Sequence, residues 1–398
     1  MPEVPFLDLT HPDFSFDSPE VAEARERSWY ARTPVGIIVL RYAEVRELLH
    51  DRRLAQDGRR YMELNGITSG PVYDWFVPLI LHRNGDDHVR LRRVVQKAFT
   101  PRRINELRPF MRETATALAE RIAESGECDF VEAFADPLPV AVMSRLLGVP
   151  PEDYDVFHGW STDIGLVFSL TNADVYERVE RAVVELHGYV DSLIAQRRSR
   201  PEDDLLSTLV AAQQEENRLD AEELRNLVVS LVFAGHDTTR HQLGLAMVAL
   251  CAHPEQWSAL RDDPEPADRA VDEILRWSPA APAVFRFALQ DFDYQGLHIP
   301  AGTFVMLGSH PAHHDPRVFE GGDSFDITAT RPAGHLTFGA GPHYCLGAAT
   351  ARAEIAEALP ALASTLGTPN LAGPVSWRSP IGVYGPTSVP VRFGPSPA

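Results

Sequence analysis

A glycine-rich segment contains the side chain in this sequence that is best suited to hold a metal. The segment FGAGPHYCLG runs from Phe338 to Gly347 and includes Cys345, one of three cysteines in the chain. Cys345 comes directly before a helical pattern at about residues 346–366, where free backbone amides lower a thiol pKa and favour the thiolate. The glycines that leave room for a flat ligand beside the sulfur are Gly339, Gly341 and Gly347. The segment predicts a thiolate ligand to something large and planar, with a buried, inert cysteine as the alternative.

A second group of reactive side chains interrupts an apolar helix. The sequence LDAEELRNLVVSLVFAGHDTTRHQLGLAMVALCAH has capping-box spacing between Asp220 and Glu223, and no proline follows until Pro254. Residues 227–234 are apolar on nearly every face, so we expect this helix to cross the interior. The polar run GHDTT at residues 235–239 then enters the buried stretch, where an unpartnered acid is costly. Polar residues satisfied within a long helix are the bland alternative.

Three more clusters could bind ions. His88 and Arg92 in HVRLR are four residues apart, which places both on one helix face. Glu273 and Arg276 in EILR have the spacing of a helical ion pair. The run HPAHHD, with His310, His313, His314 and Asp315, looks like a metal site. We discount it because its proline disrupts a regular helix and no second ligand group is apparent.

The composition of the chain indicates one large globular domain. Hydrophobic residues make up 44% and charged residues 23%, as in ordinary folded proteins. No repeat or linker divides the sequence, so we expect a single domain over residues 1–398. The first two thirds are mainly helical in pattern, and short β-like runs follow Pro279. The expected fold class is therefore mainly α with small β-sheets.

Charge and cysteine usage exclude several partners. The net charge of −19 disfavours a nucleic-acid partner. Residues 88–108 nevertheless carry six arginines and one lysine, Lys97, against one glutamate, so this stretch could dock an acidic protein or be a solvated helix face. Three separated cysteines form no disulfide framework or zinc motif. With no apolar leader and no membrane span, we expect a protein of the cytoplasm with no membrane partner.

The cysteine segment resembles the haem-binding signature of the cytochrome P-450 family, F-G-x-G-x-H-x-C-x-G, at every defined position. Three further family motifs occur along the chain in the expected order, so the resemblance covers essentially the whole chain. They are HVRLR at residues 88–92, AGHDTT at residues 234–239 and EILR at residues 273–276. The resemblance implies the cytochrome P-450 fold, in which a long central helix lies over haem b.

The same resemblance implies a role for each motif residue. Cys345 would be the axial thiolate on haem iron, which favours cleavage of the O–O bond. Asp237 and Thr238 would be the catalytic pair, with Thr238 hydrogen-bonding dioxygen and Asp237 relaying protons. Glu273 and Arg276 would be structural, and the sequence leaves open whether Arg331 completes their network. The residues implied to contact the cofactor or its propionates are His88, Arg92, Ala234, Arg286, Phe338, Gly339, His343, Cys345 and Gly347.

The implied activity is that of a haem-thiolate monooxygenase. Electrons would come from a separate ferredoxin or flavodoxin, because no reductase domain fits within this length. The stretches that line the pocket in the family are apolar and aromatic here, with Trp75, Phe76, Phe168 and Phe285, so the substrate would be an apolar or aromatic small molecule. Similar bacterial proteins tailor polyketides or peptides, either free or bound to a carrier protein. A haem-free helper with this fold and a peroxide-driven peroxygenase are the alternative functions.

Overall fold

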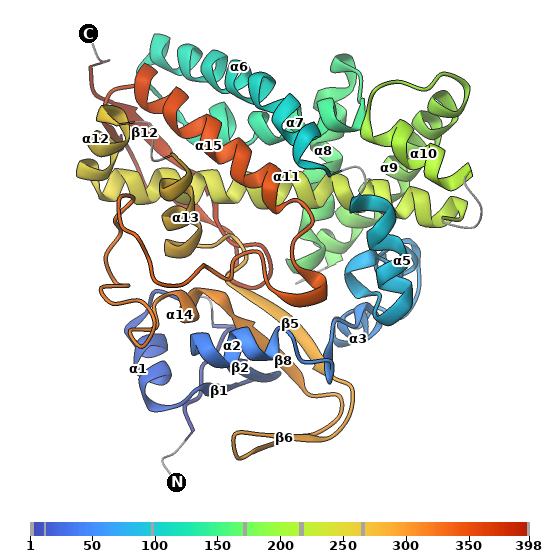
Figure 1. Ribbon diagram of the computed structural model, residues 1–398, viewed down its shortest axis with the longest axis vertical. Helices are drawn as coiled ribbons and strands as arrows, with labels where there is room; N and C mark the ends of the chain where they lie inside the picture. The colour runs from blue at the N-terminus through green and yellow to red at the C-terminus, as the bar shows by residue number, and fades with distance from the viewer. Residues whose placement is uncertain are drawn as a thin grey trace.

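The computed structural model describes residues 4–11, 13–96, 99–169, 173–214, 219–263 and 267–395. Figure 1 shows a thick layer of helices above a smaller layer built around β-strands near the N-terminus. The fold is therefore mainly α with small sheets, as the sequence predicts. No helix within the described ranges is long and apolar enough to cross a membrane. Lys97, which was counted in the basic stretch, lies outside the described residues.

The helices account for most of the chain. The longer ones are α1 (Pro19–Arg27), α5 (Gly85–Gln96), α6 (Pro101–Ser125), α7 (Pro137–Leu147), α8 (Tyr154–Ile164), α9 (Ala173–Ser199), α10 (Leu205–Gln214), α11 (Ala221–Ala252), α12 (Pro254–Asp262), α13 (Ala267–Trp277) and α15 (Ala348–Thr365). The short ones are α2 (Tyr42–Leu48), α3 (Gly58–Leu64), α4 (Pro71–Phe76) and α14 (Ser309–His313). Single turns lie at η1 (Ile80–His82), η2 (Val131–Ala135), η3 (Pro151–Asp153), η4 (Gly165–Ser169) and η5 (Gly341–His343).

The strands form four small sheets. The largest has the order β1 (Tyr30–Thr33), β2 (Gly36–Val39), β8 (Phe304–Gly308), β5 (Ala283–Ala288) and β3 (Leu54–Ala55). Its β2 and β8 are parallel, with Gly36 opposite Phe304, and every other pair in it is antiparallel. The smaller sheets pair β6 (Phe292–Tyr294) with β7 (Leu297–Ile299), β10 (Ser376–Trp377) with β11 (Pro386–Ser388), and β4 (Glu127–Asp129) with β12 (Pro390–Phe393) and β9 (Pro369–Leu371).

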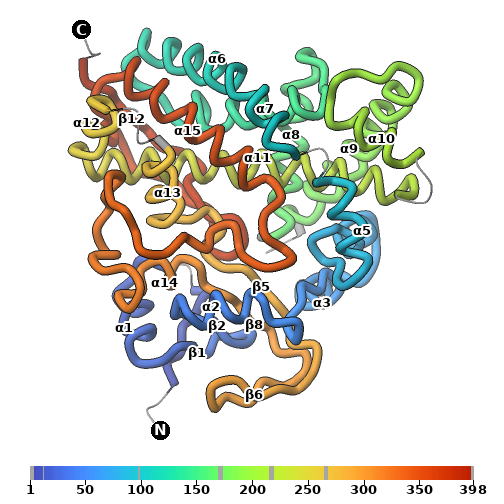
Figure 2. The backbone as a smooth tube through the Cα atoms, in the orientation of Figure 1, coloured from blue at the N-terminus to red at the C-terminus, as the bar shows by residue number. Residues whose placement is uncertain are grey.

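Helix α11 forms the central axis of the helical layer, as Figures 1 and 2 show. It begins with the predicted capping box, in which the Asp220 carboxylate accepts from the Glu223 N–H and the Glu223 carboxylate accepts from the Asp220 N–H. Most of its residues are buried, including the polar His236, Asp237 and His241. The predicted crossing of the interior is confirmed.

One predicted helix is shorter than the sequence pattern suggests. The sequence pattern over residues 152–168 predicts a single helix, but the regular α-helix there is α8, flanked by the turns η3 and η4. At the end of α8, a Cβ on Gly165 would lie 2.7 Å from the Asp237 carboxylate of α11. The tighter turn after Ile164 therefore occurs where the chain passes directly against α11.

Candidate active site

The loop before α15 is held by glycine conformations and a backbone hydrogen bond. Gly339 and Gly341 both have φ of +69°, a left-handed conformation that other residues adopt at a cost of roughly 1–2 kcal/mol. The Cys345 N–H then donates to the Phe338 carbonyl oxygen at 2.8 Å, which closes the loop. Gly347 is the N-cap of α15, so the cysteine lies at the amino end of that helix. The sequence predicted this placement.

The Cys345 thiol has the surroundings of a metal ligand. Its side chain is accessible, whereas Cys128 and Cys251 are each half-buried. The backbone N–H groups of Gly347 and Ala348 donate to the sulfur, and the Arg92 charge lies near it. The protein that surrounds this exposed side chain nevertheless desolvates the thiolate and raises the pKa of the Cys345 thiol above its ordinary value, and these donors lower it only in part. The predicted lowering of this pKa by backbone amides is therefore present, but desolvation of the thiolate outweighs it.

Four basic side chains converge close to this loop. His88 and His343 have ring centroids 4.2 Å apart, and Arg92 Nη2 donates to the Tyr344 carbonyl oxygen at 2.6 Å. Arg286, on β5, is 4% exposed, and its Nη1 donates to the Phe285 carbonyl oxygen at 2.9 Å. The sequence predicted these four residues as one set, and the structure brings them together from α5, β5 and the cysteine loop.

This basic cluster, made of His88, Arg92, Arg286 and His343, lacks a negative partner. Among the described residues, none of the four pairs with a carboxylate. Burial lowers the pKa of Arg286 to about 10, and burial together with His88, Arg286 and Arg92 lowers that of His343 to about 3. Uncompensated buried cations are costly, so the cluster is suited to a ligand that brings carboxylates. Haem b carries two propionates, and it therefore fits the residues that are present.

The face of α11 around Ala234 is also open. Ala234 is exposed and Thr238 is half-buried, although Phe233, Asp237 and Thr239 next to them are buried. The Thr238 hydroxyl donates to the Ala234 carbonyl oxygen at 2.8 Å, so this hydroxyl bonds to the backbone of its own helix. Helix α11 also contacts α15, at whose amino end Cys345 lies. A small side chain and a hydroxyl are thus presented on an accessible patch of a buried helix.

Asp237 is buried in an ion-pair network that the sequence did not reveal. Its Oδ2 lies 2.7 Å from Arg378 Nη1, and its Oδ1 lies 3.2 Å from Arg240 Nη2. Burial raises the pKa of Asp237, but the charges of His241, Arg378 and Arg240 outweigh it, and the net shift is downward. Asp237 is therefore a carboxylate on a helix interior, with a partner that comes from the segment before β11.

A neighbouring network uses the histidine of the same motif. His236 Nε2 lies 2.6 Å from Asp136 Oδ1, and His158 Nε2 lies 2.6 Å from Asp136 Oδ2. The other ring nitrogen of His236, Nδ1, lies 2.8 Å from the Ser161 hydroxyl. Sequence reasoning missed Arg378, Asp136 and His158. These residues lie far from α11 in the sequence, so no local pattern indicated that they contact it.

The ion-pair network around Glu273 answers the question that the sequence left open. Glu273 binds Arg276 through two contacts of 2.7 and 2.8 Å, and both residues are 2% exposed. Arg331 Nη2 lies 2.6 Å from Glu273 Oε1, so Arg331 does complete the network. Arg276 also donates to the carbonyl oxygens of His313, Gly322 and Ser324. This network fixes α13 against the loop that leads toward the cysteine.

The histidine run at residues 310–315 does not behave as one unit. His313 is buried between the Arg276 carbonyl oxygen and the Leu336 N–H, at 2.9 and 2.6 Å. Asp315 accepts from the Tyr42 N–H at 3.0 Å. Despite its proline, the run contains the short helix α14. The expectation that no second ligand group is available was wrong, because Asp17 lies 3.0 Å from His310.

An aromatic cluster connects the elements that were expected to line a substrate pocket. Tyr61 stacks on Phe285 at 4.9 Å, Phe168 meets Phe76 at 5.6 Å, and Trp75 meets Phe233 of α11 at 5.8 Å. Tyr61 of α3 and Phe233 were not singled out as a pair by the sequence. Their ring contacts show that α3, α4, η4, α11 and β5 meet at one apolar region.

Much of the basic stretch at residues 88–108 is neutralised by acids. Its paired arginines are Arg90 with Asp87 and Glu223, Arg102 with Glu106, Arg103 with Asp203, and Arg108 with Glu357. Arg93 is exposed on α5. The surface charge is therefore smaller than the sequence count suggested.

Comparison with known proteins agrees with this geometry. The model of the family described as Cytochrome P450 matches residues 37–265 and 266–364. The luteothin monooxygenase of Streptomyces thioluteus is 46% identical over 394 residues, which cover 98% of this chain and 97% of that protein. The solved structure of cytochrome P450 CYP109Q5 from Chondromyces apiculatus superposes with a TM-score of 0.89 at 30% identity, covering all of both chains. The structure of P450BioI in complex with a hexadec-9Z-enoic acid-ligated acyl carrier protein gives a TM-score of 0.86 at 29% identity, covering 97% of this chain and 99% of that one.

Proposed function

Because the chain belongs to the cytochrome P450 family, we propose that it is a monooxygenase that oxidises an apolar or aromatic natural product in a bacterial biosynthetic pathway. The enzyme class is that of its named relatives, and the cofactor of the family is haem b. When bound, haem supplies the activation of molecular oxygen.

Cys345 and the basic cluster would hold the cofactor. The Cys345 sulfur would be the protein ligand to iron, and the N–H groups of Gly347 and Ala348 would stabilise its negative charge. The basic cluster would bind the two propionates, which supply the negative partners that these cations lack in the chain alone. Phe338 and Gly339 would pack beside the sulfur, and the small, exposed side chain of Ala234 on α11 would leave space for the group.

Thr238 and Asp237 would control protons at the open face of α11. The Thr238 hydroxyl can exchange its bond to the Ala234 carbonyl oxygen for one to a bound ligand, since it both donates and accepts. Asp237 would deliver protons after release from Arg378, whose side chain reaches it from a different part of the chain. The presence of both groups favours the use of dioxygen over a peroxide-driven reaction.

The aromatic cluster supports an apolar substrate. Rings from five elements meet there, and such surfaces bind apolar or aromatic molecules. One relative is named luteothin monooxygenase, and this name supports a natural product as the substrate. A structure of the same fold, P450BioI, is in complex with an acyl carrier protein ligated to hexadec-9Z-enoic acid, which supports carrier-bound delivery as a second possibility. We propose that the substrate is a free small molecule. The alternative is a substrate that is delivered while bound to a carrier protein.

Electrons would enter from a ferredoxin on the side of the cysteine loop. Arg92 contacts that loop, and the neighbouring Arg93 is exposed on the same helix. An acidic iron–sulfur protein would be attracted to a positive group there. The three cysteines are free, which suits a reducing compartment, and we propose the cytoplasm as the location and one domain as the organisation.

The accessible Cys345 sulfur, with its backbone donors, is the observation that carries the proposal. In the carbon monoxide difference spectrum of the reduced protein, the thiolate band that gives the family its name should appear in the native protein and be absent in Cys345→Ser. Cys251→Ser changes a half-buried thiol elsewhere and should keep the band. A colourless native protein, or a band that survives in Cys345→Ser, would overturn the proposal, and the first result would favour a haem-free helper.

A further inference from the structure

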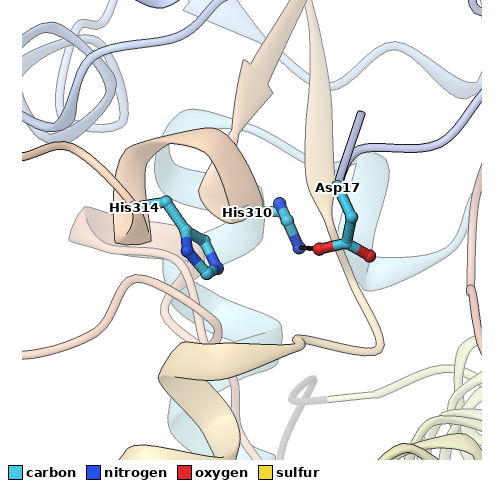
Figure 3. A group of neighbouring side chains, drawn as sticks. All are labelled: Asp17, His310 and His314. Atoms are coloured by element: carbon cyan, nitrogen blue, oxygen red, sulfur yellow. Dashed lines mark ion pairs between the residues drawn. The ribbon is translucent and has the colours of Figure 1, made fainter. Parts of the chain in front are cut away.

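Two histidines and an aspartate form a cluster separate from the candidate active site. Figure 3 shows His310 between Asp17 and His314, with the imidazole of His310 directed at the Asp17 carboxylate. Asp17 precedes α1, His310 belongs to α14, and His314 follows α14. One ligand atom from each of the three residues lies within 4.8 Å of the others. The three side chains thus come together from two distant parts of the sequence.

His310 is buried and lacks the hydrogen bonds that burial requires. The residue is 3% exposed. Its Nε2 lies 3.0 Å from the Asp17 carboxylate but makes no hydrogen bond, and its Nδ1 likewise has no hydrogen-bond partner among the described residues. A buried imidazole with an unsatisfied ring nitrogen is costly unless another group completes it. This deficit points to a ligand at the cluster.

His314 has the hydrogen bond that usually orients a metal-binding imidazole. Its Nε2 lies 3.0 Å from the Trp277 carbonyl oxygen, which can only accept, so Nε2 carries the proton. The Nδ1 lone pair is then free, and the Asp323 carboxylate lies 3.6 Å from it.

The cluster is also accessible from outside. The Asp17 side chain is 65% exposed, and that of Asp323 is 83% exposed. All four residues line a cavity of about 940 Å³, which gives an entry route. In a tetrahedral zinc site with bonds of about 2.0–2.1 Å, ligand atoms lie roughly 3.3 Å apart. The His310 and His314 rings stack with centroids 4.8 Å apart, so their side chains would turn toward the ion on binding.

We propose that Asp17, His310 and His314 bind a divalent transition metal of the zinc class, with Asp323 available as a fourth ligand. Two imidazoles with one or two carboxylates are a donor set that Zn²⁺ prefers. The metal would fasten the segment before α1 to α14 and, through the Trp277 carbonyl, to the end of α13. Its role would be structural, because the cluster contains none of the residues assigned to haem or to oxygen.

The second histidine cluster in the molecule is less suited to a metal. Asp136, His158 and His236 also lie within reach of one ion. Both carboxylate oxygens of Asp136 already accept from histidines at 2.6 Å, His236 Nδ1 bonds Ser161, and Arg240 lies 3.5 Å from Asp136. A metal there would displace satisfied bonds beside a cation. This cluster therefore provides a matched control.

Zinc binding to the haem-loaded protein tests the proposal. After chelator treatment, titration with Zn²⁺ alone, followed by calorimetry and by metal analysis per haem iron, should show one zinc per haem. Asp17→Asn, His310→Gln and His314→Gln should each weaken binding at least tenfold. His158→Gln, in the second cluster, should bind zinc like the native protein. His11→Gln is a surface control. His11 is exposed and lies close in sequence to Asp17, but it does not belong to the cluster.

A thermal melt of each haem-loaded variant separates binding from folding. Zinc should raise the melting temperature of the native protein and of His158→Gln, and should have no such effect on Asp17→Asn. Asp17→Asn remains informative even if His310→Gln does not fold, because the Asp17 side chain is exposed. Absence of zinc binding, retention of binding in Asp17→Asn and His314→Gln together, or its loss only in His158→Gln would overturn the assignment.

Discussion

At the scale of single residues, Asp237 shows how a buried acid is kept ionised. Burial alone would raise its pKa, and three cationic or polarising neighbours reverse the shift. Among them, Arg378 makes the shortest contact, at 2.7 Å. The charge of Asp237 therefore depends on a residue 141 positions away in the sequence.

Replacing Arg378 should change the pH dependence of the reaction. In Arg378→Met, the pKa of Asp237 should rise, because burial is then opposed by fewer charges. The ionised carboxylate would be lost as the pH falls through this higher pKa, so the acidic limb of the kcat profile should move to higher pH. Steady-state rates across the pH range measure it. Asp237→Asn should lack that limb, and an unshifted limb in Arg378→Met would contradict the proposed relay.

Glu354 is a residue whose charge works against the fold. It is 1% exposed on α15, its Oε2 has no partner among the described residues, and burial raises its pKa well above 4.5. The folded protein therefore keeps the proton where the unfolded chain releases it, so stability falls as the pH rises above about 4.5. Glu354→Gln should unfold at a higher temperature than the native protein at pH 8, and the difference should shrink toward pH 4.5.

Glu357, on the same helix, is the matched control for this prediction. Burial raises its pKa, but Arg112 and Arg108 outweigh burial and lower it overall. Its ionised form therefore stabilises the fold above the ordinary glutamate pKa, and this contribution is lost as the pH falls through the lowered pKa. Glu357→Gln should thus destabilise at pH 8. Melting curves of both variants that moved in the same direction would contradict these assignments.

At the scale of elements, the Glu273 network holds α13 in place. Glu273→Ala would leave Arg276 buried without its negative partner and should cost about 3–5 kcal/mol of unfolding free energy. Arg331→Ala should cost less, because the Arg331 side chain is partly exposed and the pair of Glu273 with Arg276 remains. Denaturant unfolding of the haem-loaded protein compares them. Equal losses would mean that Arg331 contributes as much as the buried pair.

The elements that the sequence predicted well are those with local signals. Helix α11 has its capping box within four residues and an apolar middle, so its start and its burial could both be predicted. The cysteine loop was predictable because its glycines, its cysteine and the following helix are contiguous. The division of residues 152–168 into α8 and two turns was not, because it follows from contact between Gly165 and Asp237 of α11.

The residues that the sequence missed are those brought in by tertiary contacts. Arg378 pairs with α11, Asp17 meets His310, and Asp136 joins His158 to His236. Neither spacing nor periodicity connects such positions, since the packing of distant segments decides which of them meet. Arg331 was predicted in part. A sequence motif indicated it as a candidate partner, but only the fold showed that it reaches Glu273.

At the scale of the whole molecule, charge should govern the encounter with an electron donor. The protein has a net charge of −19, so an acidic ferredoxin needs a positive region to approach. Arg93→Glu should slow reduction by such a ferredoxin, and the difference from the native protein should shrink as salt is added. Stopped-flow reduction at two ionic strengths measures it. Arg32→Glu, on an exposed position of β1, is the control, and an equal effect there would show that only net charge matters.

The three-stranded sheet of β4, β12 and β9 carries a consequence for how the protein is made. Strand β12 lies between the other two, and Pro390 pairs with Asp129. During translation, β4 leaves the ribosome long before its partner strand exists, so this sheet cannot close until synthesis has passed residue 393. Arg378, which neutralises Asp237, is likewise synthesised late. The pocket can therefore form only when synthesis of the chain is nearly complete. A chain released early from the ribosome would expose an unpaired strand edge and an uncompensated acid to chaperones and proteases.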